Sequence, residues 1–130
     1  MISVGENVEV VVIDDDASVR RLLKEMLSVA KISHLAAGSG PEGLRLISQY
    51  KPRLAIVDVK LGGMNGFDVA HRIRDIDGGT SIIFITGYED AVKGKVGENL
   101  PVAGIVEKPF DVPRFLALIR NVLNRSARLA

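Results

Sequence analysis

The chain has 130 residues, no cysteine and a formal net charge of +1, and 47% of its residues are hydrophobic. This length fits one domain with a sizeable core, and the lack of cysteine excludes disulfide bonds, thiolate nucleophiles and cysteine-ligated zinc. Acidic and basic residues nearly balance, which argues against direct nucleic acid binding through a basic face.

The first part of the chain joins a short apolar run to an amphipathic stretch. Residues 8–13 are mostly β-branched and predict a buried strand, which ends at the Asp14–Asp16 run. The next stretch predicts a helix whose inner face repeats apolar residues at helical spacing, namely Val19, Leu22, Leu23, Met26, Leu27 and Ala30. The other face carries charged residues that we assign to solvent rather than to a docking surface, namely Arg20, Arg21, Lys24 and Glu25.

The middle of the chain repeats this alternation twice. Residues 32–37 are a weaker strand candidate, and a helix begins at residues 39–42, where Pro41 stands near the first helical position. A third strand, residues 54–57, ends at Asp58. A glycine-rich loop and a helix follow, and the helix is predicted to face the core with Val69, Ala70 and Ile73.

The last part of the chain predicts two more strands and two helices. Residues 81–85 form a strand that ends at Thr86, and residues 103–106 form one that ends at Lys108. Residues 89–100 predict a helix, although each of its two glycines costs roughly 1 kcal/mol of helix propensity. The final helix begins near Asp111 and is predicted to face the core with Phe115, Leu118, Ile119, Val122 and Leu123.

This alternation predicts an α/β domain, in which a doubly wound, five-stranded parallel sheet is covered by helices on both faces. We expect a single domain over residues 1–130, with a core of about 8–124 and a tail or linker start at 125–130. The first nine residues lack the basic start and apolar run of a secretory signal. No apolar run reaches the roughly 18 residues of a membrane helix. We therefore expect a cytoplasmic protein without membrane contact.

Ligands bind such a sheet outside the carboxyl ends of its strands. The polar residues at those ends are Asp14 and Asp15, Asp58, Thr86 and Lys108. Clustered carboxylates repel one another and favour a divalent cation, and oxygen ligands without histidine or cysteine favour Mg²⁺. A metal, a hydroxyl and an ammonium around a carboxylate can stabilise a phosphoryl group in transfer, and an aspartate can be its acceptor.

Each of these signals is weak alone. Acidic runs after a strand often only cap a helix, as we expect of Asp16, and an aspartate before a glycine-rich turn is common. The set as a whole, with one member at the end of each of four strands, is specific.

Four segments carry a resemblance to a known family. They are Val-Ile-Asp14-Asp15-Asp16, Ile-Val-Asp58-Val-Lys-Leu-Gly-Gly-Met-Asn-Gly66, Phe-Ile-Thr86-Gly and Val-Glu-Lys108-Pro109-Phe110. Their order and spacing resemble the motif set of response regulator receiver domains, over residues 8–124. The resemblance implies a flavodoxin-like (βα)5 fold with strand order 2-1-3-4-5.

The resemblance also implies the roles of single residues. Asp58 would be the phosphoacceptor, and Thr86 and Lys108 would contact the phosphoryl oxygens. Mg²⁺ would be held by Asp14, Asp15, Asp58 and the main-chain carbonyl of Lys60. The Lys108–Pro109 bond resembles the cis peptide of the family.

The family's partners follow from the same resemblance. The donor would be a phosphohistidine on a histidine kinase or a histidine phosphotransfer domain. Phosphorylation would switch a surface read by an effector domain or protein in a two-component phosphorelay. The chain would not be an enzyme in the wider sense, since it would catalyse only its own phosphorylation and dephosphorylation.

The sequence departs from the family pattern at two positions. Gly62 replaces the usual proline in the loop after the phosphoacceptor, which predicts a looser loop. Ile105 stands three residues before the lysine, where the family has a switch aromatic, and this puts the usual coupling between the threonine and the aromatic in doubt.

Two other classes of function fit the residues at the strand ends less well. A phosphatase of the haloacid dehalogenase type also phosphorylates an aspartate after a strand, but it needs a second acid two residues later, where this chain has Lys60. A flavodoxin-like flavin carrier would need a phosphate-binding loop after the first strand, and three aspartates there would repel a phosphate. A phosphorylation-independent receiver remains a further alternative, although every chemical position is filled.

Overall fold

The computed structural model describes residues 7–87 and 100–129. The strands are β1 (Val10–Ile13), β2 (His34–Ala37), β3 (Leu54–Asp58), β4 (Lys60–Leu61), β5 (Met64–Asn65), β6 (Ser81–Thr86) and β7 (Val102–Glu107). The helices are α1 (Ala17–Val29), α2 (Gly40–Tyr50), α3 (Gly66–Ile76) and α5 (Val112–Leu129). Of the helix predicted over residues 89–100, all but Leu100 lies outside the described residues.

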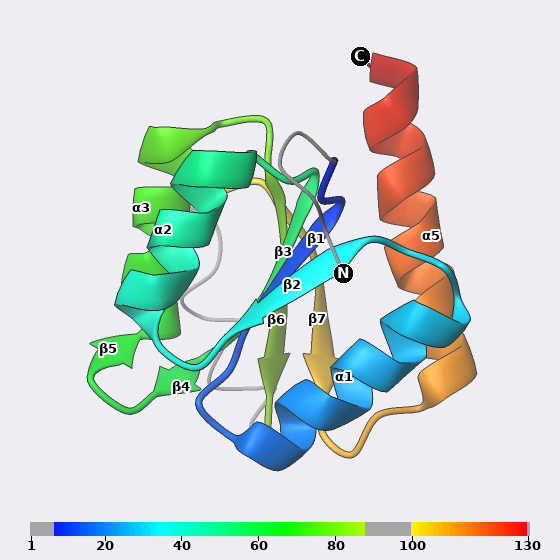
Figure 1. Cartoon of the computed structure of the whole chain (residues 1–130), viewed down its shortest axis with the longest axis horizontal. Helices are drawn as coiled ribbons and strands as arrows, with labels where there is room; N and C mark the ends of the chain where they lie inside the picture. Colours follow the sequence, from blue (N-terminus) through cyan, green and yellow to red (C-terminus); the bar gives the residue numbers. More distant parts are fainter. Residues whose placement is uncertain (1–6, 88–99, 130) are drawn as a thin grey trace.

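A five-stranded sheet with the order β2-β1-β3-β6-β7 forms the middle layer, and all of its pairings are parallel. Helices α1 and α5 cover one face, and α2 and α3 cover the other (Figure 1). Numbered by the major strands alone, this is the expected order 2-1-3-4-5, so the predicted fold is confirmed. The strand order reverses between β1 and β3, where a crevice is expected at the carboxyl ends.

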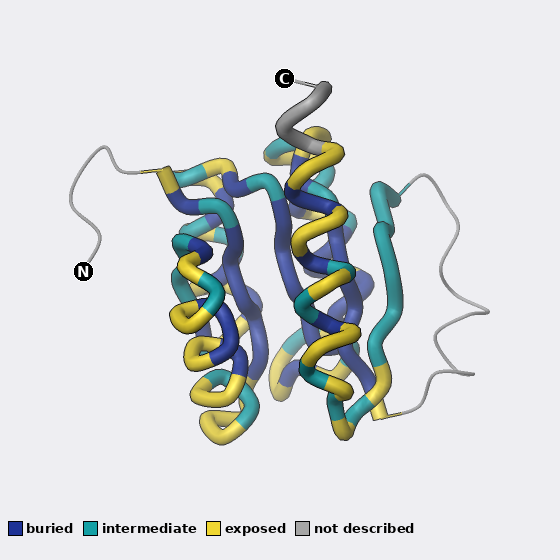
Figure 2. The backbone as a smooth tube through the Cα atoms, turned by 90° about the vertical axis from the view of Figure 1, so that its right-hand side faces the viewer, coloured by how far each residue is buried: buried dark blue, intermediate teal, exposed yellow. Residues whose placement is uncertain are grey.

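Two apolar cores lie on the two faces of the sheet and join it to the helices. Successive residues of a strand point to opposite faces, so each strand contributes side chains to both cores. Val11, Ile13 and Val57 pack toward α2 and α3 with Ile47 and Ile73. The alternate residues of the same strands pack toward the other two helices, in a cluster that includes Val10, Val12, Ile56, Leu23, Leu27, Phe115 and Ile119. Figure 2 shows the inner strands buried along their length, whereas β7, at the sheet edge, is only partly buried.

Each of the four described helices begins with a side-chain oxygen that accepts a hydrogen bond from a main-chain N–H of the first turn. The Asp16 carboxylate accepts a hydrogen bond from the Ser18 N–H at 2.8 Å, which confirms its expected role as a cap for α1. Ser39 caps α2 by accepting from the Glu42 N–H at 3.3 Å. Such caps satisfy amides that the helix itself leaves unpaired.

Two details differ from the sequence predictions. Leu22, expected on the inner face of α1, is 39% exposed, because the face that meets the sheet is centred on Leu23 and Leu27. The glycine-rich loop contains a small antiparallel hairpin, in which Lys60 pairs with Asn65. Among the described residues, none of the helices is both long and apolar enough to span a membrane.

Candidate functional site

The polar residues singled out by the sequence lie at one edge of the sheet. Asp14 follows β1, and Asp58 ends the neighbouring strand β3. The next strand over, β6, ends at Thr86, which is paired in register with Glu107 of β7. Lys108 comes immediately after that pair, and its N–H donates to the Thr86 carbonyl at 2.8 Å. Parallel strands of matched register therefore bring the four strand ends together.

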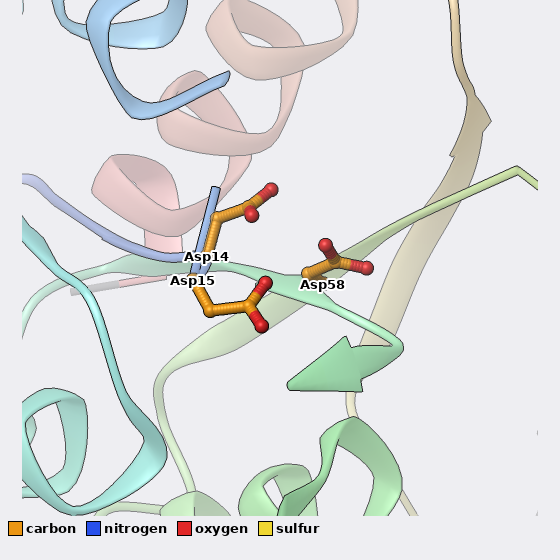
Figure 3. A group of neighbouring side chains, drawn as sticks. All are labelled: Asp14, Asp15 and Asp58. Carbon is orange, nitrogen blue, oxygen red and sulfur yellow. The ribbon is translucent and has the colours of Figure 1, made fainter. Parts of the chain in front are cut away.

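Asp14, Asp15 and Asp58 form an acidic cluster at this edge (Figure 3). Each offers one carboxylate oxygen, and these three atoms lie within 4.8 Å of one another. Asp14 is fully buried and Asp58 is 5% exposed, whereas Asp15 is exposed. Two buried charges and one solvent-facing charge thus share a small space.

The Lys108 ammonium is the counter-charge of this cluster. Its Nζ donates to Asp58 Oδ2 at 3.0 Å and lies 3.5 Å from Asp14 Oδ2. The longer contact is an ion pair and not a hydrogen bond. Asp14 Oδ2 is buried and has no hydrogen-bond partner. With all groups ionised, the negative charges of the cluster still exceed the positive one.

The buried position changes the acid–base behaviour of two groups. The pKa of Asp14 is raised from 3.8 to about 6, chiefly by burial and also by the nearby Asp58 charge, which together outweigh the lowering effects of the Asp16 amide and of Lys108. Burial alone would lower the pKa of Lys108, but the hydrogen bond that Lys108 donates to Asp58 and the charges of Asp14 and Asp58 outweigh it, so its pKa is raised. Lys108 therefore stays protonated at neutral pH.

The donor set fits a hard divalent cation. All three side chains offer carboxylate oxygens, and one of these oxygens, Asp14 Oδ2, is buried without a hydrogen bond. A buried carboxylate oxygen without a hydrogen bond favours a further positive charge in addition to the Lys108 ammonium at 3.5 Å. Oxygen ligands in small number are typical of Mg²⁺, which keeps several of its waters.

The remaining predicted residues lie at the same edge. Thr86 is 4% exposed and follows Ile85, which is the register partner of Asp58. Lys60 is exposed, and its N–H donates to Asp58 Oδ1 at 3.1 Å. The Lys108–Pro109 peptide is cis, as the resemblance implied.

Two glycines near the site have contacts that the sequence did not reveal. Gly66, at the start of α3, packs so closely on the main chain of Asp58 that an added Cβ would collide with the Asp58 carbonyl oxygen and come within 2.8 Å of Val59 Cα. The Gly62 N–H donates to Asp15 Oδ2 at 3.1 Å, a bond that a proline at this position lacks. The close packing of Gly66 on Asp58 is indicated in the sequence only by the presence of a glycine at the first position of the helix.

Comparisons with known proteins identify the family. The family model described as "Response regulator receiver domain" matches residues 10–120. Among curated proteins, the chain is 33% identical over 122 residues to a "Probable transcriptional regulator ycf27" of Guillardia theta, covering 94% of this chain and 48% of that protein. It is 31% identical over 117 residues to the "DNA-binding response regulator MtrA" of Mycobacterium tuberculosis, covering 90% of this chain and 51% of the relative. The chain thus spans about half the length of the curated relatives it matches.

Solved structures agree with this assignment. A response regulator receiver domain protein from Clostridium thermocellum superposes with a TM-score of 0.85 at 25% identity, covering 95% of this chain and 99% of that one. A CheY-like receiver domain protein from Methanospirillum hungatei has the same TM-score at 23% identity, over 96% of this chain and all of the other, and shows the fold alone. From the family match, the parallel sheet and the polar residues at its edge, we conclude that the chain belongs to the response regulator receiver domains of two-component systems.

Proposed function

We propose that Asp58 is the residue that accepts the phosphoryl group in this receiver domain. The observation that carries the proposal is the 3.0 Å hydrogen bond between Lys108 Nζ and Asp58 Oδ2, at the end of β3 and beside two further carboxylates. The hydrogen bond fixes the orientation of the Asp58 carboxylate, and it places a positive charge next to the carboxylate oxygen that would react. The same ammonium lies farther from the other buried carboxylate, at 3.5 Å from Asp14 Oδ2, so its shorter contact is with Asp58.

The proposed transfer makes one bond and breaks one. An Asp58 carboxylate oxygen attacks the phosphorus of a phosphohistidine on a histidine kinase or phosphotransfer domain. A P–O bond forms to Asp58, the P–N bond breaks, and the imidazole leaves with the electron pair. Lys108 neutralises one phosphoryl oxygen, and the Thr86 hydroxyl donates a hydrogen bond to another. The work of these residues is positioning and charge neutralisation, as in phosphoryl transfer generally.

Mg²⁺ fits the acidic cluster and would supply further neutralisation of the transferred charge. The residues proposed to hold it are Asp14, Asp15, Asp58 and the main-chain carbonyl of Lys60. The Lys60 N–H already holds Asp58 Oδ1, and the Gly62 N–H holds Asp15 Oδ2, so amides of the loop orient two of these carboxylates. This chemistry covers only the chain's own phosphorylation and dephosphorylation.

The proposed setting is a cytoplasmic phosphorelay with a histidine kinase or phosphotransfer domain as donor. The chain spans about half the length of the curated relatives it matches. We therefore propose that an effector domain or protein binds the surface that phosphorylation changes. The relatives include proteins named as DNA-binding, whereas for this chain we propose no direct contact with nucleic acid. We also retain the prediction of one domain over residues 1–130, with its core at 8–124.

Intact-mass measurement after incubation with acetyl phosphate and Mg²⁺ tests the proposal. The wild type is expected to gain one phosphoryl adduct, and Asp58→Asn none, because the amide is not nucleophilic. Asp68→Asn is a matched control, since Asp68 is an exposed aspartate in the first turn of α3. An adduct of equal yield on Asp58→Asn would overturn the assignment.

A further inference from the structure

Arg20 makes a contact that its expected place on the solvated face of α1 did not predict. The side chain is half-buried, and its Nη1 donates to the main-chain carbonyl oxygen of Asp14 at 2.8 Å. Arg21 and Lys24, expected on the same face, are exposed. A guanidinium bond to a main-chain carbonyl is charge-assisted and geometrically defined.

This bond lies at the point where the chain leaves the sheet. The Asp14 N–H donates to the Ala37 carbonyl of β2 at 3.1 Å, so β2 holds this side of the residue. Arg20 holds the other side, by its carbonyl oxygen. Because a peptide unit is planar, fixing the Asp14 carbonyl also fixes the plane that leads to the Asp15 Cα. One guanidinium therefore restrains the backbone between the two neighbouring aspartates.

The backbone of β2 leaves room for this arrangement at Gly38. A Cβ added to Gly38 would lie 3.2 Å from Arg20 Nη1 and 3.4 Å from its Cζ. The guanidinium thus rests over a residue without a side chain, directly after β2. The hydrogen bond places the guanidinium on the Asp14 carbonyl, and the glycine contact places it against Gly38, so the two observations fix its position between the ends of β1 and β2.

We propose that Arg20 is a positioning residue, which holds the Asp14–Asp15 peptide so that both carboxylates face the cation site. The inference rests on the proposed function of the acidic cluster. Arg20 does not touch the metal or the phosphoryl group, and it acts through the main chain. Residues that orient metal ligands typically change metal affinity by 10- to 100-fold when they are removed.

Mg²⁺ titration by calorimetry compares Arg20→Ala with Arg21→Ala. The two variants remove the same charge from adjacent positions of α1, so their long-range electrostatic effects are matched. We expect Arg20→Ala to weaken Mg²⁺ binding about tenfold, with Arg21→Ala within twofold of wild type. Equal losses in both variants, or no loss in Arg20→Ala, would overturn the proposal. Arg20→Lys, which keeps the charge and the helix propensity but has a single donor group, is expected to retain only part of the affinity.

Hydrogen exchange in the metal-free protein gives a readout that does not depend on metal or phosphoryl binding. The Asp16 N–H donates to Asp14 Oδ1 at 2.8 Å, so its protection reports the position of Asp14. In Arg20→Lys, we expect exchange to speed up several-fold at the Asp15 and Asp16 amides, with the amides of β3 unchanged. A uniform increase across β3 would mean a general loss of stability and would contradict a positioning role. If the wild type binds Mg²⁺ but accepts no phosphoryl group, the proposed role of Asp58 is wrong. The hydrogen-exchange comparison still tests the role of Arg20, because it needs neither the metal nor a phosphoryl group.

Discussion

Lys108 and Asp58 lie 50 residues apart in the sequence, and their side chains meet at 3.0 Å across the carboxyl edge of the sheet. The same ammonium lies 3.5 Å from Asp14 Oδ2. One lysine therefore balances part of the charge of two buried carboxylates, and it stands beside the atom proposed to be phosphorylated.

Replacing Lys108 tests this relationship. Lys108→Met keeps much of the side-chain length but removes the charge, and we expect the rate of adduct formation from acetyl phosphate to fall by about 10²-fold, as when one donor to a developing charge is removed. Lys24→Met is the control, because Lys24 is exposed on α1. A rate for Lys108→Met within threefold of wild type would show that the ammonium has no part in the transfer.

The buried Asp14 predicts a pH dependence of stability. Its pKa is raised to about 6 by burial, so the folded protein binds the proton more tightly than the unfolded chain does. The contribution is favourable at pH 4 and is lost as the pH rises toward and through 6, by up to about 3 kcal/mol for a shift of this size.

Asp14→Asn removes this titration. We expect the variant to be more stable than wild type at pH 8 without Mg²⁺, and the difference to shrink at pH 4.5. Urea denaturation at the two pH values measures it. A difference that is the same at both values would contradict the raised pKa.

The close packing at Gly66 predicts that a larger residue at this position disturbs the site. In Gly66→Ala the new Cβ collides with the main chain of Asp58 and Val59, so the start of α3 has to move. We expect a loss of about 1–3 kcal/mol in the free energy of unfolding, as for overpacked sites, together with slower adduct formation. Gly63→Ala is the control, because nothing lies within 4 Å of its added Cβ. Equal stability of the two variants would refute the close packing at Gly66.

The ends of β1, β3 and β6 could be predicted from the sequence because each of these apolar runs stops at a polar residue, whereas the strand order followed from the resemblance to the family. The Leu54–Asp58 strand is an example, and the parallel arrangement then brings its end next to that of β1. The β4–β5 hairpin could not be predicted, since two-residue strands have no periodicity to detect. The exposure of Leu22 depends on which face of α1 meets the sheet, and periodicity sets that direction only to within one residue.

The features of the site likewise fall into those that the sequence predicts and those that it does not. Its chemical groups follow from residue type and position, whereas the contacts that orient them depend on distances between separate elements. The Arg20 bond to the Asp14 carbonyl and the Gly62 amide bond to Asp15 are of this second kind. Neither residue type indicates such a bond by itself, because arginine on a helix face most often meets solvent and glycine in a loop most often serves the turn.

Ile105 predicts how the switch differs from the family pattern. It is a β-branched residue in β7 without a hydroxyl, so it cannot signal by moving a polar tip between solvent and interior. We expect phosphorylation to act mainly on residues 87–100, of which 88–99 lie outside the described structure. Hydrogen exchange with and without beryllofluoride, a phosphoryl mimic, measures this. The largest change should fall in that segment, and a maximum around Ile105 would contradict the prediction.

The identity of the phosphorylated residue tests the proposed role of Asp58 most directly. Borohydride reduces an acyl phosphate on aspartate to homoserine, so treatment of the phosphorylated protein followed by peptide mass analysis locates the acceptor. We expect homoserine at position 58 alone, and only when Mg²⁺ was present during phosphorylation. Homoserine at position 14 or 15, or a phosphoryl group that resists borohydride, would contradict it.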